Sequence, residues 1–335
     1  MQVLQPTRRK SISYAKYGYF FILPFFLVYF FFQLYPLINT FVLSFFGNGK
    51  EHMNEFVGLQ NFQYLLSSGD SLPRNVRAIH SDFVRDIGNT VILWIGNFIP
   101  QIALSLLLAV WFTDTKMKIK GQGFFKVVMY MPNIITATSV CALFLTLFGN
   151  TKYGAINSFL INAGIRTEAF KFVDGWTSSR VIVMFVQTWM WFGNTMILLM
   201  SGIMGINPSL FEAAAIDGAN SGQIFFRITL PVLKPIFIYV LITSMIGGLQ
   251  MFDIPYLFHE AAGPTAMRPN LETVAVFIYK HFHQQDPNYG YSAAASVLLF
   301  FITTLLGSVT FATNNSANKV KKNRKQEQTK KKLGG

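Results

Sequence analysis

Residues Tyr19–Ile38 read YFFILPFFLVYFFFQLYPLI, a stretch without a charged side chain. A helix needs about 20 apolar residues to cross a hydrocarbon core of about 30 Å, so this stretch predicts a membrane-spanning helix. Pro24 lies inside it, and a helix in lipid tolerates proline where its neighbours satisfy the freed carbonyl group. The number of further stretches of this kind decides the fold class.

Five further charge-free stretches have comparable length and hydropathy, and the fifth span is the shortest. Pro100 and Pro132 fall inside two of them. Two other apolar stretches, 56–69 and 153–165, are too short and too polar to cross. The sequence therefore predicts an all-α integral membrane protein with six transmembrane helices, at Tyr19–Ile38, Val91–Phe112, Val127–Phe148, Val181–Ile203, Ile236–Phe252 and Ala293–Ala312.

Composition supports lipid as the solvent. The chain has 335 residues, of which 52% are hydrophobic and 13% charged, whereas a soluble domain carries about 25% charged residues. A single cysteine excludes a disulfide framework. The net charge of +13 could indicate nucleic-acid binding, but the basic tail Lys319–Lys332 has no interleaved aromatic residues for base stacking. No nucleic-acid partner is predicted.

The distribution of basic residues predicts the orientation. With the N-terminus inside and six crossings, the inside segments hold 18 Lys and Arg, and the outside loops hold 10 against 11 acidic residues. Because positive residues stay on the cytoplasmic side, we expect a multi-pass protein of the plasma or inner membrane with both termini cytoplasmic. The first apolar run is too long for a cleavable signal peptide, and no small-residue cleavage site follows it.

These spans divide the chain into a cytoplasmic tail (1–16), a transmembrane domain (17–313) and a basic cytoplasmic tail (314–335), which suits anionic lipid headgroups. Three long loops are predicted outside. They could form a docking surface for an extracellular partner or serve as plain connectors, and the sequence leaves both open. The loops are residues 47–90, 149–180 and 253–292.

The cytoplasmic loop 207–235 contains signals for two short helices. Asn207 is a good N-cap, and the first helix should run to about Asp217, where Gly218 suits a left-handed stop. Asn220 can cap a second helix, expected to end before the Leu-Pro pair at 230–231.

The first of these helices carries small residues, Ala213 and Ala214, beside one acidic residue, Glu212. A face of small residues allows close approach of another protein, and a carboxylate there can pair with a basic partner. On periodicity alone, an ordinary amphipathic helix on the membrane surface is the favoured interpretation.

The residue pattern of this loop closely resembles the EAA signature of ATP-binding-cassette importer permeases, which is Glu-Ala-Ala, three residues, Gly, then Ile-x-Leu-Pro. Here the signature residues are Glu212, Ala213, Ala214, Gly218, Ile228, Leu230 and Pro231. An extended pattern is similar to the carbohydrate-uptake subfamily of maltose-type and glycerol-phosphate-type permeases. It includes Asp217-Gly218-Ala219, Phe226, Pro235, Phe21-Ile-Leu-Pro24, Tyr35-Pro36-Leu37, Phe252-Asp253-Ile-Pro255 and Gly263-Pro264, and the similarity covers nearly all of 17–313.

The resemblance implies a permease subunit of an ATP-driven, binding-protein-dependent oligosaccharide importer, forming half of the translocation pathway. The loop would be a coupling helix seated in a groove of a cytoplasmic ATPase subunit. Implied partners are a second permease, which the family favours as a different chain, two ATPase subunits, an extracellular sugar-binding protein, the carbohydrate and lipid. ATP and Mg belong to the ATPase, and no cofactor is expected on this chain. The implied coupling residues are Glu212, Ala213, Ala214, Asp217 and Gly218.

Polar residues inside the spans predict the substrate pathway, because such groups are costly in lipid unless they face protein or water. Gln187, Trp191 and Asn194 share one face of the fourth span. Asn97 and Gln101 repeat this spacing in the second span, where hydrogen bonding between helices is an equal alternative. An aromatic plane with amides suits a sugar.

Two further pathway residues, Gln250 and Asp253, lie at the outer end of the fifth span and just beyond it. The resemblance adds Met190. Counted from Glu212, positions 187, 190, 191 and 194 match those that contact sugar in the maltose-type permease.

Two alternative functions make different sequence demands. An ATP-independent secondary transporter or channel predicts carboxylates inside the membrane, but the six spans are charge-free. A membrane-embedded enzyme predicts a clustered catalytic set, and none is visible. The pair His281-x-His283 has no further ligands at suitable spacing for a metal. Gly49-Lys50 lacks the remaining residues of a phosphate-binding loop.

Overall fold

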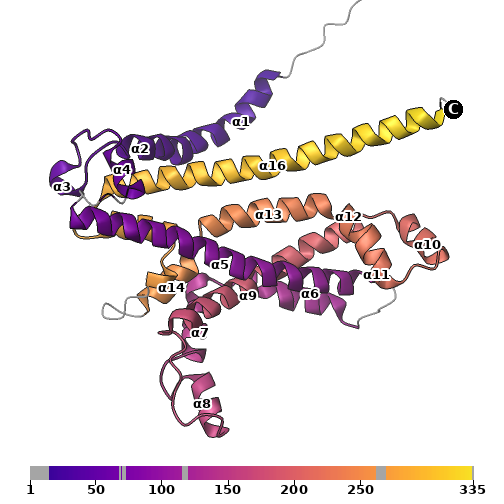
Figure 1. The fold of residues 1–335 in the computed structure, drawn as a ribbon, viewed down its shortest axis with the longest axis horizontal. Helices are drawn as coiled ribbons and strands as arrows, with labels where there is room; N and C mark the ends of the chain where they lie inside the picture. Colours follow the sequence, from indigo (N-terminus) through magenta and orange to yellow (C-terminus); the bar gives the residue numbers. More distant parts are fainter. Residues whose placement is uncertain (1–14, 68, 70–72, 115–119, 262–268, 334–335) are drawn as a thin grey trace, which may run out of the picture.

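The computed structural model describes residues 15–67, 69, 73–114, 120–261 and 269–333 as an elongated bundle of helices (Figure 1). Within these ranges β pairing is limited to one isolated bridge between Phe46 and Phe56. The basic residues at 8–10 and the Gly-Pro pair at 263–264 lie outside the described residues.

Five helical segments are long and apolar enough to cross a membrane. The first, Tyr17–Leu43, joins α1 (Ala15–Tyr29) to α2 (Tyr35–Leu43) through a π-helical turn at Phe30–Leu34. The others are α5 (Arg74–Thr113), α9 (Trp176–Met204), Lys234–Glu260 with α13 (Lys234–Leu249) and α14 (Asp253–Glu260), and the Tyr289–Ala312 part of α16 (Tyr289–Leu333).

The predicted third span is broken. Helix α6 (Gln122–Tyr130), continued by a 3-10 turn at Met131–Asn133, meets α7 (Ala137–Leu147) at a bend of 93°. The prediction of one continuous helix over Val127–Phe148 is therefore wrong. Pro132 lies at the break, where its missing N–H and fixed φ disfavour a continuing helix.

The bent pair lies in sequence between two parallel helices. Helices α5 and α9 pack side by side and run parallel, since contacts pair residue 89 with 180, 97 with 188 and 101 with 195. A chain that leaves one span can enter a parallel neighbour only after returning across the membrane, and α6 and α7 lie between them in sequence. Counted as one span, the bent pair brings the candidate membrane spans from five to six.

Helices extend further outside the apolar stretches than hydropathy indicates. Helix α5 begins at Arg74, well before Val91. The stretch 149–180 holds α8 (Ala155–Asn162) and the start of α9, and 253–292 holds α14, a 3-10 turn at Pro269–Leu271 and α15 (Val274–His283). The predicted outside loops therefore contain helices, and charged residues in them are paired, such as Glu272 with Lys280. Two short helices, α3 (Gly49–His52) and α4 (Gln60–Leu66), lie in 47–90.

Small and polar residues allow α9 to pack closely against its neighbours. The Ser105 hydroxyl of α5 donates to the carbonyl of Phe192 at 2.7 Å. At the next residue, a Cβ on Gly193 would collide with the backbone of Met129 and Tyr130. Close backbone approach at small residues is how helices associate in lipid, where no hydrophobic force draws them together.

Replacing Gly193 with Ala should destabilise this packing by about 1–3 kcal/mol, because α6 must move to admit the methyl group. Gly88→Ala on α5 is the matched control, since its Cβ would meet no atom within 4 Å. We expect Gly193→Ala to lower the thermal midpoint of the purified protein in detergent and Gly88→Ala to leave it unchanged or raise it. Equal midpoints for both variants would contradict the close approach.

Candidate functional site

A cavity of about 490 Å³ lies among α5, α9, α13 and the start of α14. Its volume falls in the range of small-molecule sites. The cavity contains every residue predicted for the substrate pathway, although these come from four separate segments. The eight residues are Asn97, Gln101, Gln187, Met190, Trp191, Asn194, Gln250 and Asp253.

A break in the fifth span forms part of the cavity wall. Helix α13 ends at Leu249 and α14 begins at Asp253, so the predicted continuous helix to Phe252 is wrong. The intervening residues Gln250, Met251 and Phe252 all line the cavity. Irregular backbone at membrane depth is tolerated where it is buried in protein or lines a water-filled space, so the cavity accounts for the position of the break.

Two of the predicted polar residues hold helices together. The Gln101 amide donates to the Thr195 hydroxyl at 2.8 Å, which links α5 to α9. The Asn97 amide donates to the carbonyl of Leu93 in its own helix, and the Asn97 carbonyl accepts from Thr188 at 3.0 Å. The alternative of side-chain hydrogen bonding between helices therefore describes Gln101, whereas Asn97 contacts α9 through its backbone carbonyl.

The other four polar residues predicted for the pathway have side chains that can bind a ligand. Within the described part of the chain, the side chains of Gln187, Asn194, Gln250 and Asp253 form no hydrogen bond to the protein. Trp191 beside them is 48% exposed. These free amides, one carboxylate and an aromatic plane are groups that can bind a polyhydroxyl ligand.

Sequence reasoning missed several lining residues, among them Trp94, Tyr239, Thr243 and Ser244. The Trp94 indole N–H donates to the Ser244 hydroxyl at 3.2 Å. Trp94 precedes Asn97 by three residues and so shares its helix face, a signal that the sequence did contain. Tyr239 and Thr243 are four residues apart, as Asn97 and Gln101 are, and so share one face of α13.

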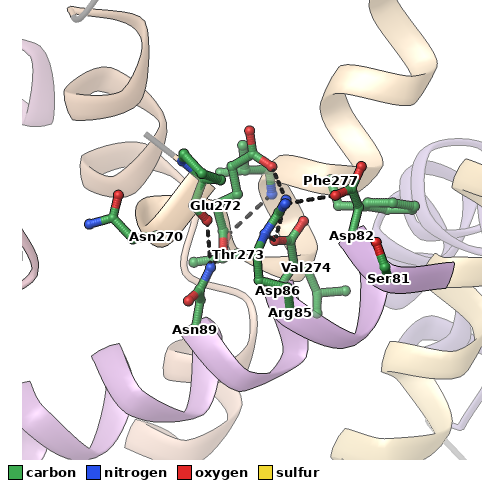
Figure 2. Close-up of polar contacts among 12 residues, drawn as sticks. Ser81, Asp82, Arg85, Asp86, Asn89, Asn270, Glu272, Thr273, Val274 and Phe277 are labelled. Atoms are coloured by element: carbon green, nitrogen blue, oxygen red, sulfur yellow. Dashed lines mark hydrogen bonds and ion pairs between the residues drawn. The ribbon is translucent and has the colours of Figure 1, made fainter. Parts of the chain in front are cut away.

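Beyond the cavity, a cluster of charged residues joins α5 to the segment before α15 (Figure 2). The Arg85 guanidinium contacts Asp82 at 2.6 Å, Asp86 at 3.0 Å and Glu272 at 2.6 Å. Lys280 also pairs with Glu272, at 2.5 Å. Asp86 and Glu272 are almost fully buried, so these carboxylates depend on their cations. Burial lowers the pKa of the nearby His281, which favours the neutral form of that imidazole.

The cluster is connected to the cavity through one short segment. The Asn89 amide donates to the carbonyls of Pro269 and Glu272, and Arg180 of α9 contacts Asn89 and the carbonyl of Asn270. Thr273, which follows Glu272, donates a hydrogen bond at 2.7 Å to the carbonyl of Met251, and Met251 lines the cavity. The charged cluster thus holds the broken part of the fifth span in position.

Arg85→Met should destabilise the protein by about 3–5 kcal/mol, because the buried Asp86 loses its cation and the buried Glu272 keeps only Lys280. Arg74→Met, at the exposed start of the same helix, should change stability by no more than about 0.5 kcal/mol. Chemical or thermal unfolding in detergent measures both. A similar loss for the two variants would mean that the cluster contributes nothing specific.

The loop predicted to couple to an ATPase lies at the end of the bundle shared with the C-terminal end of α16 (Figure 1). Helix α10 (Pro208–Ile216) begins at Asn207, whose side chain accepts from the backbone of Ser209, and Gly218 adopts a φ of +74°. Both features agree with the prediction. Asn220 and Gln223 form a capping box at the start of α11 (Ser221–Ile224).

The second helix of the loop does not stop before the Leu-Pro pair as predicted. It continues from α11 through a π-helical turn, Phe225–Thr229, into α12 (Leu230–Val232). The wider turn changes the hydrogen-bond register, which lets the helix accommodate Pro231, a residue with no N–H to donate. A similar turn at Phe30–Leu34 precedes Pro36.

The coupling residues are distributed between surface and interior. Glu212, Ala213, Asp217 and Gly218 are exposed, whereas Ala214 is buried. Ile216, at the end of α10, has 87% of its surface exposed.

Comparison of the sequence with known protein families identifies the family of the chain. Residues 76–317 match the family described as the binding-protein-dependent transport system inner membrane component. The chain belongs to this family. As a member, it is a multi-pass membrane permease subunit, and ATP hydrolysis is carried out by a separate subunit.

Relatives within the family match along nearly their whole length. The lactose transport system permease protein LacF of Rhizobium radiobacter is 28% identical over 307 residues, which cover 91% of this chain and 97% of LacF. The arabinooligosaccharide transport system permease protein AraP of Bacillus subtilis is 27% identical over 312 residues, 92% of each chain.

A solved structure shares the fold. A chain of a bacterial ABC transporter that imports the acidic polysaccharide alginate superposes with a TM-score of 0.75 at 22% identity, covering 89% of this chain and 95% of that one.

Proposed function

We propose that this permease forms half of the translocation pathway of an ATP-driven oligosaccharide importer. The observation that carries the proposal is the cavity, in which eight residues chosen for sugar binding meet from four segments. The named relatives, which transport lactose and arabinooligosaccharides, support a carbohydrate substrate. Alternating access would open this cavity to each side of the membrane in turn.

The proposed orientation places both termini and α10 in the cytoplasm. Six passes put the two termini on one side, and the distribution of Lys and Arg favours the cytoplasm for that side. The cavity break and the charged cluster of Figure 2 then lie toward the outside. An extracellular sugar-binding protein would dock there, and the family's dependence on such a protein supports this.

The first span supports a second permease as partner. No residue in the apolar window of Tyr17–Leu43 is buried by the rest of this chain. Aromatic residues that face no neighbour, such as Phe20 and Phe21, are 72% and 79% exposed. We propose that a different permease chain completes the pathway and packs against this helix, while two ATPase subunits bind the α10 end of the two permeases.

The pathway assignment is tested by removing one aromatic plane. Trp191→Ala should lower uptake about tenfold in proteoliposomes holding the complete transporter, because a stacking surface and its buried area are lost. Trp111→Ala is the control, since Trp111 has the same 48% exposure but lies outside the cavity. Uptake must also require ATP. Uptake that persists without an ATPase subunit would favour the alternative, an ATP-independent transporter or channel.

The coupling assignment is tested at the two glycines of the loop. Gly218→Ala should separate ATP hydrolysis from uptake, because a φ of +74° costs a non-glycine residue about 1–2 kcal/mol and α10 would shift. Gly222→Ala in α11, where φ is negative, should leave coupling intact. The measurement is sugar transported per ATP hydrolysed. Normal coupling in Gly218→Ala, with folding unchanged, would remove the support for α10 as the coupling helix.

A further inference from the structure

The cavity contains one ionised side chain. Asp253 is exposed at the start of α14 and lines the cavity, and the lining residues that the structure describes include no Lys, Arg or His. The remaining polar groups are amides and hydroxyls, including those of Gln187, Asn194 and Thr243. A ligand in this half of the pathway therefore meets a negative charge among neutral donors and acceptors.

The positive end of α14 does not offset this charge. A helix N-terminus favours anions through its free N–H groups and its dipole. The N-terminus of α14 lies at the break that lines the cavity. Asp253 is the first residue of α14, so its carboxylate already interacts favourably with that dipole. An anionic ligand would have to share the helix end with Asp253.

The nearest cations of the outer cluster are committed elsewhere. Arg85 and Lys280 pair with Asp82, Asp86 and Glu272. Arg180 donates to Asn89 and to the carbonyl of Asn270. Releasing any of them toward a ligand would leave buried carboxylates or carbonyls without a donor, which is costly.

We propose, on the basis of the function proposed above, that this half of the pathway selects uncharged oligosaccharides and rejects uronates, with Asp253 as the specificity-determining residue. Its two oxygens accept hydrogen bonds from neighbouring sugar hydroxyls, and the same charge repels a carboxylate on the sugar. The alginate importer with a related fold transports an acidic polysaccharide. The substrate class would therefore differ within one fold.

The test uses the complete transporter with its ATPase and binding protein. Uptake of maltotriose, cellotriose and galactotriose into proteoliposomes first identifies the neutral trisaccharide that is transported fastest. Binding of that sugar and of its C6-oxidised uronate is then titrated on the transporter in nanodiscs without the binding protein, so that only the pathway selects. The variants are Asp253→Asn, Asp253→Glu and, as control, Glu260→Gln at the other end of α14, outside the cavity.

We expect the neutral sugar to bind at least about tenfold more tightly than the uronate, which corresponds to about 1.4 kcal/mol. This ratio should fall toward one in Asp253→Asn and persist in Asp253→Glu and Glu260→Gln. A merely structural role for Asp253 would weaken both ligands together and leave the ratio unchanged, which would overturn the inference.

Equal binding of the two ligands by the native transporter would also overturn it, as would uptake without measurable binding to the transporter alone. Both results would leave the proposed function in place. Failure of all three neutral sugars to be taken up with ATP would count instead against the proposed function.

Discussion

The parallel packing of α5 against α9 is the contact on which the rest of the structure depends. It is held by hydrogen bonds along its length, from Arg180 with Asn89, through Thr188 with Asn97, to Ser105 with Phe192. Because the two helices run parallel, the intervening chain must cross back, and the bent α6 and α7 pair follows. The same contact brings Asn97 and Gln101 to the face that Gln187 and Asn194 occupy. Helix packing and the cavity therefore have one origin.

Helix α9 also gives the molecule a mechanical connection between its two ends. It carries four of the eight predicted cavity residues and leads, after a turn at Gly205, directly into α10. At about 1.5 Å per residue, Trp191 lies about 20 Å along the helix axis from its end at Met204. A displacement of α10 by a motor protein would therefore reach the cavity wall through one continuous helix.

The sequence predicted what depends on local pattern. Apolar length identified the spans, spacing at i, i+4 and i+7 grouped the cavity residues, and capping residues located α10. Prediction from the sequence failed where contacts between residues far apart in the chain determine the structure. Hydropathy averages over the bend after Met131 and over the break at Gln250–Phe252, because both are apolar. The charged start of α5 was predicted as a loop, because the partner of Arg85, Glu272, lies 187 residues further along the chain. Trp94 and Tyr239 could have been found by the same spacing that selected Asn97.

The break in the fifth span explains how one segment can serve both packing and transport. A continuous helix would satisfy its own backbone and leave the cavity wall rigid. At Gln250–Phe252 the backbone instead depends on a contact from outside the span, since the carbonyl of Met251 accepts from Thr273. Thr273 adjoins Glu272, whose carboxylate is fixed by Arg85 and Lys280. The position of this wall thus depends on the charged cluster at one end and on α13, which follows α12 and the loop 207–235, at the other. The cavity wall is therefore positioned by contacts on both sides of the break and not by helical hydrogen bonds alone.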